Sequence, residues 1–267
     1  MSESKRKGAR STKDIPVEIL EQLNRGEIET ANLVEWLAVD QRLLLENLLI
    51  SNNRTVYLEP ILSKINDLEK KTVNTINEVI GVTIFKQVVA HNDYEFLDVL
   101  ANHKADLIRC WATYTIGQDE KLSIADSLSR IQPFAADLHF GVREICWMAL
   151  RNKIAQNLTE SIDILSEWAK SSDDNVRRFA TEAIRPRGVW CTHINELKEK
   201  PELALPILER LKADSARYVQ DSVGNWLNDA SKSQPQFVKE LCKRWEGESK
   251  GKETAYIVKK ALRTINK

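Results

Sequence analysis

Five copies of a short phrase, an aliphatic residue usually followed by a base, recur in the chain after residue 105. The aliphatic residues are 34, 34, 43 and 39 residues apart, at Ile108, Val142, Val176, Val219 and Val258. A period of about 40 residues is typical of HEAT and armadillo repeats, in which each repeat is built from helices. Because one repeat cannot bury its apolar face alone, such repeats stack into an α-solenoid with a long concave surface.

The rest of the sequence agrees with an all-α protein. The chain has 9 Gly and 7 Pro in 267 residues, too few for a β protein dense in turns, and they fall between apolar-periodic segments. We therefore predict a right-handed superhelix of about six HEAT-like repeats, the first ones degenerate. Residues 1–14 lack hydrophobic periodicity and are expected to form a disordered basic tail before a single domain, 15–267. The N-terminal helices are expected near 16–26, 31–50, 56–69 and 71–90.

The sequence pattern argues against a membrane protein, a secreted protein and a metal-binding protein. No uninterrupted apolar stretch reaches the length of about 18 residues that a membrane span needs, and the charged start of the chain does not resemble a secretory signal. The four cysteines lie dozens of residues apart without a CxxC pair, and the four histidines form no metal motif. The sequence predicts a cytoplasmic, reduced monomer without a metal or another cofactor.

The net charge is zero, but the charge is unevenly distributed. Residues 1–13 hold five bases and one acid, residues 176–190 hold four bases and one acid, and residues 250–267 hold six bases and one acid. Local basic clusters in a neutral protein favour a polyanionic partner, and a solenoid would collect them in a concave basic groove. The alternative is that these bases form ordinary solvated helix faces.

The base after each repeated aliphatic residue also has a purely structural interpretation. In HEAT repeats an Arg at this position often pairs with an acid in the preceding loop and so ties repeats together. Arg143 near Asp137, or Arg177 near Asp173, would fit that role. Both interpretations remain open for each of these bases.

Three segments of the repeats, 175–190, 218–232 and 255–264, strongly resemble the DNA alkylation repair family of HEAT-like-repeat proteins. The resemblance covers about residues 105–267, and before that it extends only to the helical layout. It implies a protein that cradles duplex DNA in its groove, with bases of successive second helices on the phosphates. Enzymes of the family excise cationic alkylpurines such as 3-methyladenine and 7-methylguanine, using aromatic residues against the sugar and a carboxylate. Other branches bind DNA, including branched forms, without excision.

Carried over to this chain, the resemblance gives Asp229 and Glu182 as candidate catalytic carboxylates. Two positions depart from the family pattern: Gln220 stands where an Arg is common, and Trp147 stands where a Glu is expected. Trp190 follows Arg185 and Arg187 in a loop with a Pro186–Gly188 frame, and is suited either to stack on a sugar or base or to pin the loop to the next helix. The predicted DNA-binding residues are Arg143, Arg177, Arg178, Arg185, Arg187, Trp190, Gln220, Lys259, Lys260 and Arg263.

The sequence therefore predicts a protein that binds duplex, damaged or branched DNA in alkylation or structure-specific repair. One alternative is a glycosylase that hydrolyses the N-glycosidic bond of cationic alkylpurines. The other is a HEAT scaffold that binds a protein partner, whose groove would be lined by apolar and acidic residues. The altered positions at Trp147 and Gln220 weigh against efficient excision.

Overall fold

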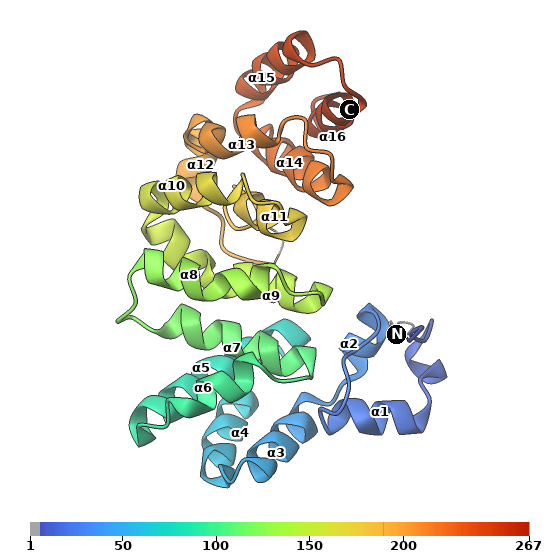
Figure 1. Ribbon diagram of the computed structural model, residues 1–267, viewed down its shortest axis with the longest axis vertical. Coiled ribbons are helices and arrows are strands. Elements are labelled where there is room, and N and C mark those ends of the chain that lie inside the picture. Colours follow the sequence, from blue (N-terminus) through green and yellow to red (C-terminus); the bar gives the residue numbers. More distant parts are fainter. Residues whose placement is uncertain (1–5, 189, 267) are drawn as a thin grey trace. The chain divides into compact units, whose positions relative to one another are not determined.

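A computed structural model describes residues 6–188 and 190–266 (Figure 1). Within these residues the chain forms sixteen α-helices, three short 3-10 helices and no strand. The all-α prediction is thus confirmed for the described part of the chain. The helices up to residue 118 are α1 Val17–Asn24, α2 Leu33–Ala38, α3 Gln41–Ser51, α4 Leu58–Asn66, α5 Val73–His91, α6 Glu95–Ala101 and α7 Asp106–Gln118.

The remaining helices follow the repeat seen in the sequence. They are α8 Ile124–Ala135, α9 Phe140–Gln156, α10 Leu158–Trp168, α11 Asp174–Glu182, α12 Asn195–Glu199, α13 Leu205–Leu211, α14 Arg217–Ala230, α15 Pro235–Glu248 and α16 Lys252–Ala261. The first four copies of the repeated phrase lie in the first turn of α7, α9, α11 and α14, and the fifth lies in the second half of α16. We call these five helices the second helices.

The chain divides into two compact units, where the sequence predicts a single domain. Unit 1 holds the described residues up to Lys121 together with Leu138–Ala149, and unit 2 holds Leu122–Asp137 and the described residues from Leu150 onward. The chain passes from one unit to the other within α9. Each unit is a stack of packed helices: α5 packs on α4 and α7 in unit 1, and α14 packs on α11 and α16 in unit 2.

The repeated aliphatic residues form part of the core of each unit. All five are at most 4% exposed, which explains their period, because one inward position recurs in every repeat. Small residues between the helices allow close approach. A Cβ on Gly224 of α14 would lie only 2.9 Å from Cβ of Lys260 on α16, so the Lys260 stem packs directly on the glycine.

The N-terminal region differs from the prediction in one helix. The single helix expected over 31–50 is two helices, because Val39 is extended and the Asp40 carboxylate caps α3 by accepting the backbone N–H groups of Arg42 and Leu43. Of the segment predicted to be disordered, residues 1–5 lie outside the described residues. Residues 6–14 lie near α2, where Arg6 forms a bidentate ion pair with Glu35 at 2.6 Å.

No helix among the described residues has the length and hydrophobicity to cross a membrane.

Candidate nucleic-acid interface

The position after the repeated aliphatic residue has the same structural role in three repeats. Its side chain turns back and donates hydrogen bonds to the carbonyls five and six residues earlier, in the loop before its helix. The bonds run from Arg109 to Lys104 and His103 (both 2.8 Å), from Arg177 to Ser172 and Ser171 (3.0 and 2.8 Å), and from Gln220 to Ser215 and Asp214 (3.4 and 2.8 Å). An amide can satisfy the same carbonyls as a guanidinium, so Gln220 preserves this loop anchor without a charge.

Arg177 also joins its repeat to the next one. Its guanidinium binds the Asp214 carboxylate through two hydrogen bonds, of 2.6 and 3.0 Å, and this bond is the main cause that raises the pKa of Arg177. The partner is not Asp173, which instead caps α11 by accepting the N–H groups of Asn175 and Val176. The structural interpretation therefore applies to Arg177, but with the acid of the following loop. Arg143 lies on the part of α9 that belongs to unit 1.

Two cation–π contacts connect successive second helices of unit 2. The guanidinium of Arg178 on α11 lies 4.2 Å from the ring centroid of Tyr218 on α14. That of Arg217 on α14 lies 3.1 Å from the ring centroid of Tyr256 on α16. Arg178 is mostly covered, with 11% of its side chain exposed, whereas Arg217 is exposed. Both arginines thus stack on a tyrosine of the next second helix. Of the two, only Arg217 has an exposed side chain that a ligand can reach.

The candidate carboxylates Glu182 and Asp229 lie in one ion-pair network. Arg185 bridges them, with nitrogen–oxygen distances of 3.2 Å to Glu182 and 2.6 Å to Asp229 (Nη2 to Oδ2). Lys232 binds the other oxygen of Asp229 at 2.9 Å, and Ser222 donates to Glu182 at 2.9 Å. Both carboxylates are 3% exposed, so each is buried and already paired.

In this network, the attraction between Arg185 and the two carboxylates has a larger effect on the pKa of Arg185 than its burial. Burial lowers the pKa of Arg185, but the negative charges of Glu182 and Asp229 and their hydrogen bonds raise it further, so the net shift is upward. The guanidinium therefore stays charged, and the two carboxylates share their charge with it. Neither acid presents an unpaired oxygen to a sugar in this arrangement.

The last second helix, α16, and the turn after it carry bases in three different situations. Lys260 forms an ion pair with Asp221, which also accepts a 2.6 Å hydrogen bond from the Tyr256 hydroxyl. Burial raises the pKa of Asp221, but these two hydrogen bonds and the charges of Lys260 and Arg217 lower it more. Arg263 is exposed and donates to Asn228 at 2.8 Å, and Lys259 is exposed.

A pocket of about 500 Å³ contains two exposed bases that the sequence analysis missed. Arg217 and Lys252 line it with Ser215, Gln220, Glu253 and Tyr256. Each of the two bases is the first residue of its helix, α14 or α16. A base is disfavoured there by the helix dipole, which prefers an acid, as Asp174 provides at the start of α11. This misplaced charge is the sequence signal that could have identified them.

The loop after α11 carries the remaining predicted residues. Arg187 donates to the Ser233 hydroxyl at 2.7 Å, while Trp190 is 80% exposed with a φ of 65°. Trp147 and Trp226, by contrast, are at most 3% exposed and donate their indole N–H groups to Glu144 (3.1 Å) and to the Ile184 carbonyl (3.0 Å). Trp190 is therefore the aromatic residue available to a ligand in this region.

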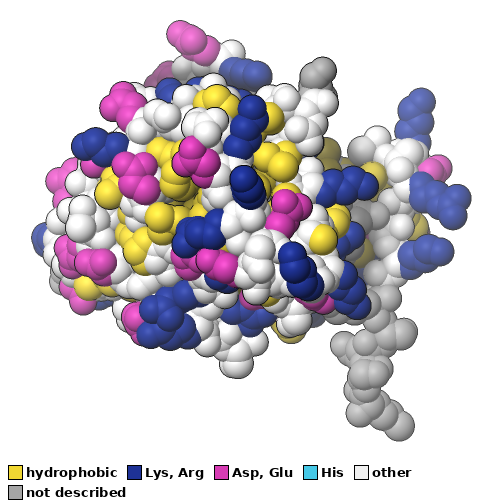
Figure 2. Space-filling model, turned by 90° about the horizontal axis from the view of Figure 1, so that it is seen from above, with side chains coloured by type: hydrophobic (Ala, Val, Ile, Leu, Met, Phe, Trp, Pro, Cys, Tyr) yellow, Lys and Arg dark blue, Asp and Glu magenta, His cyan; other side chains and the backbone are white. Residues whose placement is uncertain are grey.

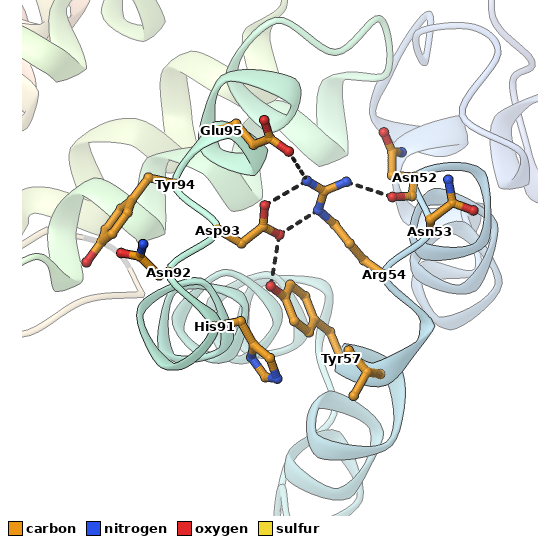
Figure 3. A pocket seen from close by; sticks show the side chains of 10 residues that line it. Asn52, Asn53, Arg54, Tyr57, His91, Asn92, Asp93, Tyr94 and Glu95 are labelled. Carbon is orange, nitrogen blue, oxygen red and sulfur yellow. Dashed lines mark hydrogen bonds and ion pairs between the residues drawn. The ribbon is translucent and has the colours of Figure 1, made fainter.

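A second, larger pocket, of about 670 Å³, lies in unit 1 beside Arg54 (Figure 3). Arg54 binds Asp93 through two bonds of 2.6 and 2.7 Å and Glu95 at 3.0 Å, and Tyr57 donates to Asp93 at 2.8 Å. These groups join the loop before α4 to the loop before α6, so their polar atoms are engaged with one another. Among the described residues, no group of three or more His, Cys, Asp or Glu side chains is arranged to hold a metal ion.

Bases are mixed with acids on the face of the molecule shown in Figure 2. Figure 2 shows Lys and Arg side chains interspersed with Asp and Glu side chains on the face it presents, with hydrophobic atoms between them. Binding of a polyanion therefore depends on which bases are left unneutralised by neighbours. In unit 2 these include Arg217, Lys252 and Lys259, which are exposed.

The helical repeats and the exposed bases of unit 2 define a HEAT-like-repeat protein with a basic site on its second helices. Residues 136–265 match the family model described as DNA alkylation repair enzyme. The resemblance predicted from the sequence is thereby confirmed over these residues.

Known relatives and solved structures agree with this assignment. The chain is 35% identical over 144 residues to the uncharacterized protein YhaZ of Bacillus subtilis (strain 168), a match that covers 53% of this chain and 38% of that protein. AlkD2 from Streptococcus mutans is similar in structure, with a TM-score of 0.60 and 26% identity over 78% of this chain and 98% of AlkD2.

The Pseudomonas fluorescens alkylpurine DNA glycosylase AlkC, solved bound to DNA containing an abasic site analog, shares the fold. Its TM-score is 0.67 with 20% identity, over 97% of this chain and 66% of AlkC. The chain thus spans less than two-fifths of the Bacillus relative and just under two-thirds of AlkC.

Proposed function

We propose that this chain binds DNA through unit 2, with phosphate contacts from the exposed bases of α14 and α16. The observation that carries the proposal is the pocket in which Arg217 and Lys252 lie together at the starts of two successive second helices. Two bases and two helix N-termini in one hollow give a site for a phosphate group, because both the charges and the backbone N–H groups attract anions. Lys259 and Arg263 would extend the contact along the backbone.

The family match and the structural neighbours support DNA as the polyanion. Of the residues predicted from the sequence, Lys259, Arg263 and Trp190 are the most exposed, and we retain them as ligand contacts. Arg178, Arg185, Arg187 and Lys260 border the same helices but have protein partners, so we propose for them a smaller share of the affinity. Arg177 and Gln220 serve mainly as loop anchors.

A base-excising activity is the second candidate, favoured by the fold shared with the alkylpurine DNA glycosylase AlkC. A glycosylase of this kind needs a carboxylate directed at the cationic sugar. Here Asp229 and Glu182 are each bonded to Arg185 and buried, and displacing that guanidinium would leave a buried charge unpaired. We therefore propose binding without efficient excision of alkylated bases.

A protein partner remains as the scaffold alternative, and we disfavour it because the exposed pocket is basic rather than apolar or acidic. We further propose a monomer in the cytoplasm. A reducing compartment suits the four cysteines, none of which forms a disulfide in the described structure.

One experiment separates these candidates. The protein is incubated with an intact duplex, the same duplex with an abasic-site analogue, a four-way junction and DNA carrying 3-methyladenine, and both binding and base release are measured. Salt-dependent binding without release above background supports the proposal. Enzymatic release makes the protein a glycosylase, and the absence of binding at low salt favours a protein partner.

A further inference from the structure

Residues 183–188 and 190–194, which we call the Trp190 loop, are held at the base of the loop by a buried arginine that no part of the proposed function uses. Arg151 on α9 is 1% exposed, among the largest fully buried side chains of the described structure. It donates from Nη1 to the Ala183 carbonyl (3.0 Å) and from Nη2 to the Arg185 carbonyl (2.5 Å), both on the outgoing side of the loop. Its Nε donates to the Thr192 carbonyl (2.7 Å), on the returning side.

Burial of the Arg151 guanidinium against three backbone carbonyls is unfavourable in free energy unless the hydrogen bonds compensate it. A buried charge costs free energy unless it is paired, and carbonyl dipoles compensate it only in a fixed geometry. Burial is the largest cause that lowers the pKa of Arg151, while the nearby Cys191, Glu182 and Asp229 counteract it. The three bonds therefore fix both sides of the loop relative to α9.

Two further contacts close the loop. The Ile194 N–H donates to the Pro186 carbonyl at 3.2 Å. Gly188 packs against the inside of the loop: a Cβ there would lie 2.3 Å from Sγ of Cys191 and 3.3 Å from Cζ of Arg151. A side chain at position 188 would therefore force the Cys191 side chain to move away from the guanidinium.

Trp190 projects from this fixed base into solvent, 80% exposed. An indole in solvent gains no burial energy in the free protein, and a large aromatic residue on a preorganised loop is suited to stack on a ligand with a π-face. Bases offer such a face only where the stack is interrupted, since in an intact duplex both faces of each base are covered.

We propose that Arg151 is a positioning residue that holds Trp190 ready to stack on an unstacked base, so that the protein prefers DNA with an interrupted base stack to intact duplex. This inference rests on the proposed function, because it assigns the kind of DNA that the same site selects. Arg151 acts on the ligand only through the loop. Its effect is therefore expected in the preference between DNA forms and not in the affinity for phosphates.

The test compares binding of an intact duplex with the same duplex carrying one abasic-site analogue, at one low salt concentration. We expect the full chain to prefer the abasic duplex by about tenfold, in line with the energy of one base–aromatic stack. Trp190→Ala should remove the preference and Trp190→Phe should keep part of it, because both variants weaken binding of the abasic duplex more than binding of the intact duplex, whose affinity comes mainly from phosphate contacts. Indole fluorescence that changes on binding in the wild type, but much less in Trp190→Phe, would locate the stack.

Two variants address the clamp without altering Trp190. Arg151→Lys loses the forked geometry, and Gly188→Ala forces Cys191 away from Arg151, so both should reduce the preference for abasic DNA as Trp190→Ala does. Gly247→Ala is the matched control, because a Cβ at Gly247 meets no atom within 4 Å. It should leave the preference unchanged. Circular dichroism establishes that each variant is folded.

If Arg151→Lys or Gly188→Ala unfolds the protein, hydrogen exchange of the wild type decides. The Ile194 amide should be protected in the free protein when the loop is preorganised. Rapid exchange of that amide, or a folded Gly188→Ala variant with the full preference, would overturn the role of Arg151. Equal wild-type affinity for the two duplexes, or a preference that survives Trp190→Ala, would overturn the stacking role. Both results leave the proposed DNA binding intact, whereas failure to bind either duplex contradicts the proposed function itself.

Discussion

Asp221 on α14 pairs with Lys260 on α16 and so neutralises a base on the proposed DNA-binding face. The pair is partly exposed, with 20% of the Lys260 side chain and 38% of the Asp221 side chain accessible. Removal of the acid would return a free cation to this face and remove a charge that repels phosphate. The consequence can be measured directly.

We expect Asp221→Asn to strengthen binding of intact duplex and to steepen the slope of log affinity against log salt by about 0.9, the value for one additional phosphate contact. The melting temperature should change little, since partly exposed ion pairs contribute about 0–1 kcal/mol. Lys260→Met added to Asp221→Asn should cancel the gain. Unchanged or weaker binding by Asp221→Asn would show that Lys260 does not face the DNA.

Arg217 and Lys252 should act together on one phosphate. We expect Arg217→Gln and Lys252→Gln each to weaken DNA binding, and the double variant to lower the magnitude of the salt slope by about 1–2. Helical content should be retained because both side chains are exposed. Lys239→Gln, an exposed base on α15, serves as the control. If all three single variants bind alike, the pocket is not a phosphate site.

Arg177 and Lys259 each follow a repeated aliphatic residue, Val176 or Val258, but their substitutions should have different effects. Arg177→Ala removes a covered partner of Asp214 and two loop bonds, so we expect a loss of about 2–4 kcal/mol in the free energy of unfolding. Lys259→Ala should leave stability within about 0.5 kcal/mol and weaken DNA binding. Urea denaturation and binding measured on both variants check the contrast, which a stable Arg177→Ala would contradict.

Release of 3-methyladenine should remain at the spontaneous rate with the wild-type protein. Asp229→Asn should instead act on stability, because it leaves Arg185 and Lys232 with a weaker partner. We expect a cost of about 2–4 kcal/mol in unfolding free energy, as for other broken buried pairs. Robust release that Asp229→Asn abolishes in a folded protein would establish the glycosylase alternative.

Tyr57 in unit 1 should ionise late in an alkaline titration. Burial, the hydrogen bond to Asp93 and the charge of Asp93 raise its pKa to about 12. Because the folded pKa lies above the ordinary value of 10, this group contributes stability that is present below pH 10 and is lost as the pH rises through about 12. The difference in phenolate absorbance between wild type and Tyr57→Phe measures this step. A midpoint near 10 would mean that the cluster in Figure 3 is open in solution.

The repeat in the sequence was enough to predict the helices and the inward residues from Ile108 to Val258. It could not predict the partners of the bases that follow, because an arginine reaches an acid in either the preceding or the following loop. Arg177 illustrates this: its partner Asp214 lies 37 residues away, in the next repeat. The helix break at Val39 and Asp40 was not predicted, because the apolar positions continue on both sides of it.

The sequence by itself determined the helical class, the buried aliphatic positions and the family resemblance, because these depend on local periodicity and on motifs within single segments. The tertiary structure alone decided which charges are neutralised and which face solvent. Glu182, Arg185 and Asp229 read as separate candidates in the sequence, yet packing of α14 on α11 joins them into one buried network. Packing of α16 on α14 likewise brings Arg217 and Lys252 together in one pocket, since pairing and burial depend on distances between helices that no local pattern records.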